Sequence, residues 1–131
     1  MILLDTHVLV RLVVEPKKLS RPATKAIERA VRSGGIGVAA ITLWELASLF
    51  VRGRIRYSGT LEAAVERVIR ESGVVVREVT PVVAALAAQL PFDFPGDPAD
   101  RLIAATASAE GVPLVTADER IRDSALVRTI W

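Results

Sequence analysis

Four acidic side chains lie where the sequence pattern would bring them to one place in a folded domain. Asp5 directly follows the apolar run 2–4, Glu45 lies early in an apolar helical segment, Asp100 lies just inside a later helix, and Asp118 follows a further apolar run. Four like charges in one place repel and raise one another's pKa. A hard divalent cation with oxygen ligands removes that penalty.

The composition narrows the choice of metal, because the chain has no cysteine and one histidine. Carboxylates without such partners favour Mg²⁺ or Mn²⁺ over zinc. A metal of this kind lowers the pKa of a water, polarises a phosphoryl oxygen and neutralises developing charge. A carboxylate that is not fully engaged with the metal can accept the proton of the water. The four acids therefore indicate metal-dependent hydrolysis of a phosphodiester bond.

Each acid also has a structural explanation, because acidic side chains favour helix N-termini. Glu45 stands three residues after Thr42, which is the spacing of a capping box. Asp118 has the position of an N-cap. Thr6 is expected to cap the helix after the first strand, which leaves Asp5 without a structural role. Asp5 is therefore the strongest candidate for a metal ligand.

Strands and helices are expected to alternate along the chain. The apolar runs predict five strands, at 2–4, 36–40, 74–76, 113–116 and 127–130. Helical spacing and cap residues predict helices at 6–14, 20–33, 42–53, 60–73, 80–90 and 97–111, with a short one after Asp118. This pattern predicts an α/β fold with a mainly parallel sheet and right-handed crossovers. The carboxyl ends of parallel strands share one edge, where ligands bind.

Length and composition predict a single domain over residues 1–131. A hydrophobic fraction of 51% is enough for a full core without disulfides. No apolar run approaches the roughly 18 residues of a membrane span, and Asp5 interrupts the start in a way that a secretory signal would not. We expect a cytoplasmic protein that does not contact a membrane.

The basic side chains are unevenly distributed. Residues 1–60 carry ten Lys or Arg against four acids, and residues 61–131 carry seven against eleven. The basic connector with Arg52, Arg54 and Arg56 is a candidate for contacts with RNA phosphates, and Tyr57 for stacking on a base. A solvated basic loop is the alternative. Arg101 is expected either to pair with a neighbouring acid or to contact a phosphate.

Four sequence blocks together resemble the PIN-domain family and, more narrowly, its VapC-type toxins. They occur in the order typical of the family and span the chain: Leu4-Asp5-Thr6-His7, Thr42-Leu43-Trp44-Glu45-Leu46-Ala47, Asp97-Pro98-Ala99-Asp100-Arg101-Leu102-Ile103-Ala104-Ala105 and Leu114-Val115-Thr116-Ala117-Asp118-Glu119. The resemblance implies a five-stranded parallel sheet with helices on both faces. It also implies an endoribonuclease that depends on Mg²⁺ or Mn²⁺.

The resemblance also assigns roles to the acids. Asp5 and Asp100 would be the principal metal ligands, and Asp118 would bind the metal directly or through water. Glu45 would help to position the metal or activate the water. The hydroxyls of Thr116 and Thr6 match positions that support such a site, so these two threonines are also expected site residues.

Similar toxins form homodimers and are silenced by a small antitoxin that lies in a groove near the active site. We expect that groove around the helical segments 46–50 and 61–69. Trp44 and Phe50 are expected to be core residues. His7 is not expected to bind the metal, because the start of a helix would turn it away from Asp5.

Other functions remain open on the sequence alone. The chain could be a PIN-domain nuclease with a housekeeping role in RNA processing rather than a toxin. A phosphatase that uses Asp5 as nucleophile would need a second aspartate two residues later, where this chain has His7. A non-catalytic binding module, in which the acids only cap helices, would have to bury unpaired carboxylates at a high free-energy cost.

Overall fold

The computed structural model describes all residues, 1–131, and contains one five-stranded parallel sheet. The strands are β1 (Ile2–Leu4), β2 (Ile36–Ala39), β3 (Val75–Arg77), β4 (Leu114–Val115) and β5 (Thr129–Ile130). The helices are α1 (Thr6–Val14), α2 (Arg21–Arg32), α3 (Ile41–Val51), α4 (Leu61–Ser72), α5 (Pro81–Gln89), α6 (Pro98–Glu110) and α7 (Glu119–Arg122), with a 3₁₀ turn η1 at Pro16–Lys18. The strand order is β3-β2-β1-β4-β5, and every pairing is parallel. The predicted α/β fold is therefore confirmed.

Strand β1 is the centre of the sheet, with β2 on one side and β4 on the other. Leu3 and Leu4 are fully buried. Successive strand side chains point to opposite faces, so Leu4 packs into one apolar cluster and Leu3 into the other. A strand that is buried on both faces has a continuous run of apolar residues, which is why β1 could be predicted from the sequence.

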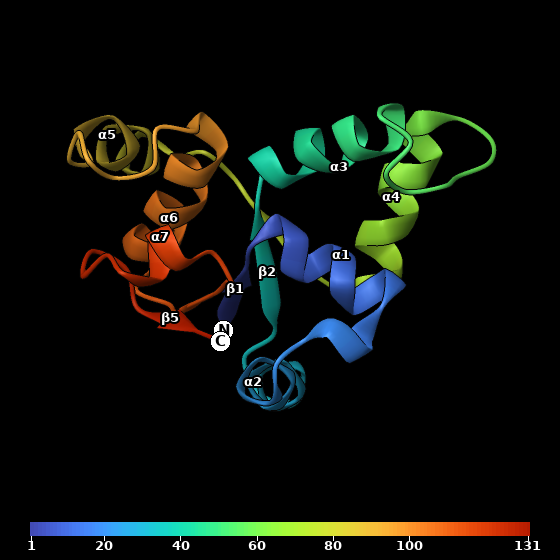
Figure 1. Ribbon diagram of the computed structural model, residues 1–131, viewed down its shortest axis with the longest axis horizontal. Helices are drawn as coiled ribbons and strands as arrows, with labels where there is room; N and C mark the ends of the chain where they lie inside the picture. Colours follow the sequence, from blue (N-terminus) through green and yellow to red (C-terminus); the bar gives the residue numbers. More distant parts are fainter.

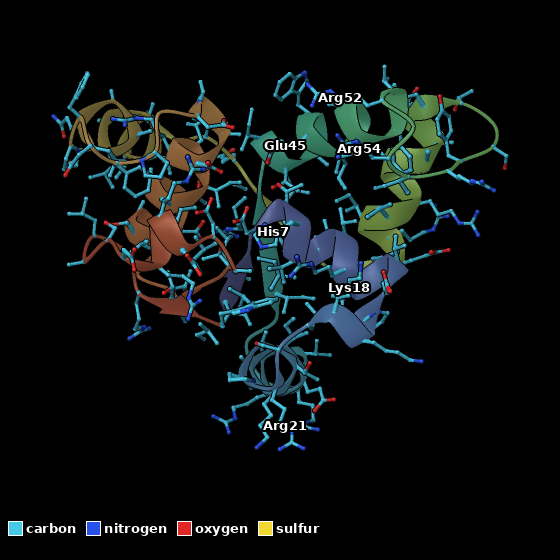
Figure 2. The ribbon with its side chains drawn as sticks, in the orientation of Figure 1. His7, Lys18, Arg21, Glu45, Arg52 and Arg54 are labelled. Atoms are coloured by element: carbon cyan, nitrogen blue, oxygen red, sulfur yellow. The ribbon has the colours of Figure 1, made fainter.

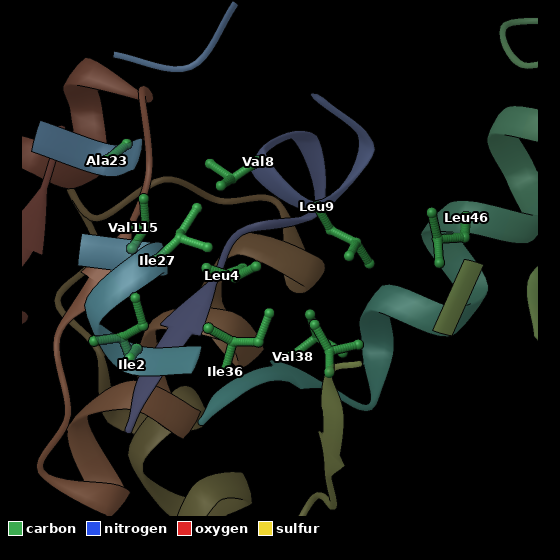
Figure 3. Packing of buried hydrophobic residues seen from close by; sticks show 12 residues of the cluster. Ile2, Leu4, Val8, Leu9, Ala23, Ile27, Ile36, Val38, Leu46 and Val115 are labelled. Atoms are coloured by element: carbon green, nitrogen blue, oxygen red, sulfur yellow. The ribbon is translucent and has the colours of Figure 1, made fainter. Parts of the chain in front are cut away.

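Helices cover both faces of this sheet (Figure 1). One face carries α1 and α2, whose side chains pack with Leu4, Val38 and Val115 in the larger cluster (Figure 3). Partly buried side chains of α4 pack against the same cluster. The other face carries α6 and α7, through Ile103 and Ile121. Helix α5 packs outside α6 rather than against a strand. The two covered faces leave the ends of the strands as the place where polar side chains can gather.

Two expected helix caps are wrong, and both corrections concern the acidic edge. Asp5, not Thr6, is the N-cap of α1, because its side chain accepts a hydrogen bond from the Thr6 amide. Helix α3 begins one residue earlier than expected, after Ala40, and has no side-chain cap. Thr42 is therefore a helical residue, and the Thr42–Glu45 pair is not a capping box.

Other helix termini agree with the sequence. Thr60 and Thr80 cap α4 and α5, and Asp97 caps α6. Gly111 ends α6 in the left-handed conformation, with a φ of 64°, which glycine adopts without steric strain.

Strand β3 lies one residue later than expected, because Val75, Val76 and Arg77 pair with Gly37, Val38 and Ala39 of β2. No helix of the structure is long and apolar enough to cross a membrane.

Candidate active site

A cavity of about 570 Å³ lies at the carboxyl end of the central strands. All four predicted acids line it, together with Asp97; they are Asp5, Glu45, Asp100 and Asp118. Figure 2 shows Glu45 near the start of α3 and His7 near the start of α1. Residues up to 113 positions apart in the sequence, Asp5 and Asp118, thus share one cavity.

Asp5 is the most deeply placed of these acids, with 4% of its surface exposed. Its Oδ1 accepts a hydrogen bond of 2.8 Å from the Thr6 amide, and its Oδ2 accepts one of 2.7 Å from the Thr116 hydroxyl. The His7 Nδ1 lies 3.4 Å from the same Oδ2. The carboxylate also faces the positive end of the α1 dipole, which favours negative charge. Asp5 is therefore fixed from both sides, by Thr116 directly after β4 and by the first residues of α1.

Glu45 is held by hydroxyl groups rather than by a cation. The Thr6 Oγ1 donates to Glu45 Oε1 at 2.5 Å and also lies 2.9 Å from the Thr42 Oγ1. Burial raises the pKa of Glu45; the Thr6 hydrogen bond opposes that rise, and the charges of Asp5 and Asp97 add to it. A raised pKa suits a group that accepts a proton near neutral pH.

Asp100 lies in the first turn of α6, where Asp97 already caps the helix through a 2.8 Å bond from the Ala99 amide. Burial raises the pKa of Asp100 to about 7, and the charges of Asp5, Asp97, Asp118 and Glu45 add to the effect, in that order. Its nearest cation is the Arg120 Nη2, at 3.7 Å. Asp100 therefore lies among several carboxylates and shares its one cationic neighbour, Arg120, with Asp118.

Asp118 differs from Asp100, because it accepts hydrogen bonds from Arg120. It caps α7 through a 2.9 Å bond from the Arg120 amide, and the Arg120 Nη2 lies 3.3 Å from its Oδ2. Partial burial acts to raise the pKa of Asp118, but the hydrogen bonds and charge of Arg120 lower it below its ordinary value. Its expected capping role is present, and it remains on the cavity wall.

His7 does not turn away from the acids, so that expectation is wrong. Its Nε2 accepts a hydrogen bond of 3.1 Å from the Ala117 amide, and its Nδ1 faces Asp5. An amide can only donate, so the imidazole is neutral, with its proton on Nδ1. Burial lowers the pKa of His7; the charge of Asp5 opposes this and that of Arg11 adds to it. His7 thus links Asp5 to the segment that carries Asp118, a role that no pattern in the sequence indicates.

The two threonines contact the predicted acids directly. The Thr116 Oγ1 donates to Asp5 and accepts a 3.1 Å bond from the Asp118 amide. The Thr6 hydroxyl donates to Glu45. Each hydroxyl therefore connects two elements at the edge of the sheet.

The residues present suit a hard divalent cation by their chemistry. The side chains around the cavity offer carboxylate oxygens, which Mg²⁺ and Mn²⁺ prefer, and Asp100 shares its one cationic neighbour, Arg120, with Asp118. In this arrangement no three His, Asp or Glu side chains converge closely enough to form a finished metal site. The donor set fits such a cation by its chemistry.

The four arginines that are candidates for RNA contacts differ in whether they line the cavity. Arg52 lines the cavity, whereas Arg54 and Arg56 do not. Arg101 does not pair with an acid, contrary to one expectation. Its guanidinium donates to the carbonyls of Ala87, Leu90 and Pro91 at 3.3, 2.7 and 3.4 Å, and so satisfies the end of α5.

The two aromatic side chains of α3 also differ. Phe50 is buried as expected, with 5% of its surface exposed, and packs edge-on against Tyr57. Trp44 is 62% exposed and lines the cavity, so the expectation that it is a core residue is wrong. It belongs to neither of the two larger apolar clusters.

The parallel sheet and the cavity lined by carboxylates define an α/β protein with an acidic ligand-binding edge. The sequence profile of the PIN domain matches residues 2–126, so the chain belongs to the PIN-domain family. It is 42% identical over 132 residues to "Ribonuclease VapC22" of Mycobacterium tuberculosis, and the alignment covers 99% of this chain and 98% of that protein. The predicted relationship to VapC-type ribonucleases is therefore confirmed.

Solved structures with this fold include complexes of toxins with antitoxins. VapBC2 from Rickettsia felis, bound to a DNA fragment from its promoter, superimposes with a TM-score of 0.73 at 18% identity, covering 98% of this chain and 97% of that one. DNA-bound VapBC from Salmonella typhimurium gives a TM-score of 0.69 at 20% identity, with the same coverage. At these identities the likeness establishes the fold.

Proposed function

We propose that this chain is a metal-dependent endoribonuclease that hydrolyses RNA phosphodiester bonds, and that it is the toxin of a toxin–antitoxin pair. The observation that carries the proposal is the cavity at the carboxyl edge, where Asp5, Glu45, Asp100 and Asp118 gather. The identity to a VapC ribonuclease supports the choice of substrate. The proposed cofactor is Mg²⁺ or Mn²⁺.

The acids divide into ligands and a proton acceptor. Asp5 and Asp100 would hold the cation, with Asp118 contributing directly or through water. The bound cation would polarise a phosphoryl oxygen and make a water more acidic. Asp100 suits this role because it shares its one cationic neighbour, Arg120, with Asp118, and Asp5 because hydrogen bonds fix its orientation.

Glu45 would accept the proton of the attacking water. Its raised pKa places it nearer to neutral pH than an exposed glutamate, and the Thr6 hydroxyl fixes one of its oxygens. The second oxygen accepts no hydrogen bond within the chain. Thr6 and Thr116 are positioning residues, because they act on the acids and not on the substrate.

The decisive assay is cleavage of a structured RNA with Mg²⁺ or Mn²⁺, repeated with excess chelator. We expect cleavage that the chelator abolishes. Asp5→Asn and Asp100→Asn should each remove cleavage while circular dichroism shows an intact fold. Unchanged cleavage in both variants would overturn the proposed site.

Proposed partners follow from the structural relatives, whose titles describe VapBC complexes. We propose a cognate antitoxin that occupies the groove between segments 46–50 and 61–69, a homodimeric toxin, and a cytoplasmic location. Helix α3 contacts α4 and also lines the acid-lined cavity, which supports placing the antitoxin on these helices. Light scattering of the isolated chain tests the dimer, and a short DNA-binding protein encoded beside this gene would support the antitoxin.

A binding module without catalysis is the second candidate, and one observation favours it. Asp5, Asp97 and Asp118 all cap helices, as that reading requires. Asp100 argues against it, because it caps nothing and is destabilised by its neighbours. A housekeeping PIN nuclease would share the site and differ only in having no antitoxin.

A further inference from the structure

The exposed indole of Trp44 has no partner within the chain. Its surface is 62% exposed although it lies on the wall of the acid-lined cavity. It precedes Glu45, the proposed proton acceptor, in α3, and both residues line the cavity. A large aromatic side chain that is exposed at the mouth of a cavity lacks the packing that would explain it as core.

Trp44 belongs to a row of cavity-lining side chains along α3. Ser48 and Arg52 follow it at intervals of four residues, and all three line the cavity. Residues four apart lie on the same helix face, and eight residues span about 12 Å of helix. The row thus leads from an aromatic face beside the acids, past a hydroxyl, to a guanidinium.

The cations along this path are free of ion pairs. Arg11 of α1 and Arg52 of α3 both line the cavity, and neither takes part in any of the six ion pairs of the structure. Arg11 lies over the ring of Trp131 at 5.4 Å. Arg120, by contrast, is bound to Asp118 and Asp100. Two arginines therefore remain available for phosphates beyond the acids.

We propose that Trp44 is a stacking platform for one unpaired RNA base next to the scissile phosphate, with Arg52 and Arg11 holding phosphates that flank it. This inference rests on the proposed ribonuclease function and deepens it, because it defines the substrate as single-stranded at the cleavage point. A base within a duplex presents no free face to an indole, whereas an unpaired base in a loop does. Stacking also tolerates any base, so Trp44 would contribute affinity more than sequence preference.

The first test compares Trp44→Ala, Trp44→Phe and Trp44→Leu in cleavage of a single-stranded RNA of twelve nucleotides. Loss of a stacked base weakens binding by about 5- to 100-fold. We expect Trp44→Ala and Trp44→Leu to raise KM by that factor with little change in kcat, and Trp44→Phe to recover most of the loss. Phe92→Ala is the matched control, because Phe92 is fully exposed but outside the cavity.

The second test observes the indole directly. The chain has two tryptophans, so Trp131→Phe leaves Trp44 as the sole indole emitter. In an Asp100→Asn background, which prevents cleavage, a twelve-nucleotide oligoadenylate should quench this emission. An RNA in which every base is removed should bind without quenching.

The outcomes separate the inference from the function on which it depends. A wild-type chain that cleaves RNA, with Trp44→Ala and Trp44→Leu unchanged in KM, overturns the stacking role and leaves the ribonuclease intact. A Trp44→Ala variant that cleaves normally but escapes the antitoxin, or changes its mass in light scattering, assigns the indole to a protein interface instead and overturns the proposal. A wild-type chain that neither cleaves nor binds RNA overturns the proposed function itself.

Discussion

The two principal acids of the edge, Asp5 and Asp100, sit in opposite environments. Asp5 follows a central strand, is 4% exposed, and accepts hydrogen bonds on both carboxylate oxygens. Asp100 follows a loop, in the first turn of α6, and has one cation at 3.7 Å. Hydrogen bonds within the chain thus compensate the carboxylate of Asp5, at the end of the strand. The carboxylate of Asp100, at the start of the helix, is compensated only in part, by Arg120.

The two acids therefore have opposite effects on the stability of the fold, although both belong to the proposed site. Hydrogen bonds to a charged group contribute about 1.5–3 kcal/mol each, so Asp5 stabilises the fold as well as the proposed site. The pKa of Asp100, raised by burial and then by Asp5, means that ionising this group opposes folding. The Asp100 carboxylate therefore lowers the free energy of unfolding of the metal-free chain, and a bound cation would offset that loss.

The largest expected effect comes from Asp5→Ala. This change removes the cap of α1, at about 1 kcal/mol, and leaves the buried Thr116 hydroxyl without its acceptor, at about 1–3 kcal/mol. We expect urea denaturation in chelator to show a loss of about 2–4 kcal/mol in the free energy of unfolding. Asp97→Ala, which removes a cap at a less buried position, is the control and should lose about 1 kcal/mol. Equal losses would mean that Asp5 is only a helix cap.

Asp100→Asn should act in the other direction on stability. The amide keeps the shape of the side chain and removes the repulsion from four carboxylates, so we expect a gain of about 1–2 kcal/mol at pH 8 in chelator. The lost attraction to the α6 dipole is smaller, at about 0.3–1 kcal/mol. Thermal unfolding should shift upward by about 3–5 °C. A lower midpoint would show that Asp100 is better compensated than its contacts indicate.

The sequence identified the positions of these acids but not their environments. Strand β1 and helix α6 are marked by local patterns, namely an apolar run and the Asp97-Pro98 start. Their alternation with the other elements was enough to predict the sheet and its acidic edge. The predicted cavity residues Asp5 and Asp100 follow from that topology.

The errors came from contacts between distant segments. Thr6 and Asp5 can both cap a helix, and the choice depends on Thr42 and Glu45, which take the Thr6 hydroxyl. Arg101 reaches carbonyls at the end of α5, 10 to 14 residues earlier. Local spacing contains no information on such partners, so their side-chain roles had to come from the structure.

The raised pKa of Asp100 should make the stability of the chain depend on pH. Asp100 has a pKa of about 7 in the folded chain and an ordinary value of 3.8, so the folded state holds a proton that the unfolded state releases between these values. The stability of the metal-free chain should therefore fall as pH rises from about 4 to 7. The gain from Asp100→Asn, about 1–2 kcal/mol at pH 8, should shrink toward zero at pH 4–5. A gain that is independent of pH would mean that the substitution acts through packing and not through charge.

The smallest expected effect is that of His7→Phe, which tests the link between the two sides of the edge. Phenylalanine keeps the ring near Trp131, which His7 meets edge-on at 6.4 Å, but leaves the Ala117 amide without its acceptor and Asp5 without its third contact. We expect a loss of about 1 kcal/mol in stability and a weakening of Mn²⁺ binding by about 10-fold, measured by calorimetry. His7→Asn, which offers a shorter acceptor, should recover part of the metal affinity. If His7→Phe loses stability but binds Mn²⁺ as the wild type does, the histidine supports the fold of the Ala117 segment and does not position Asp5.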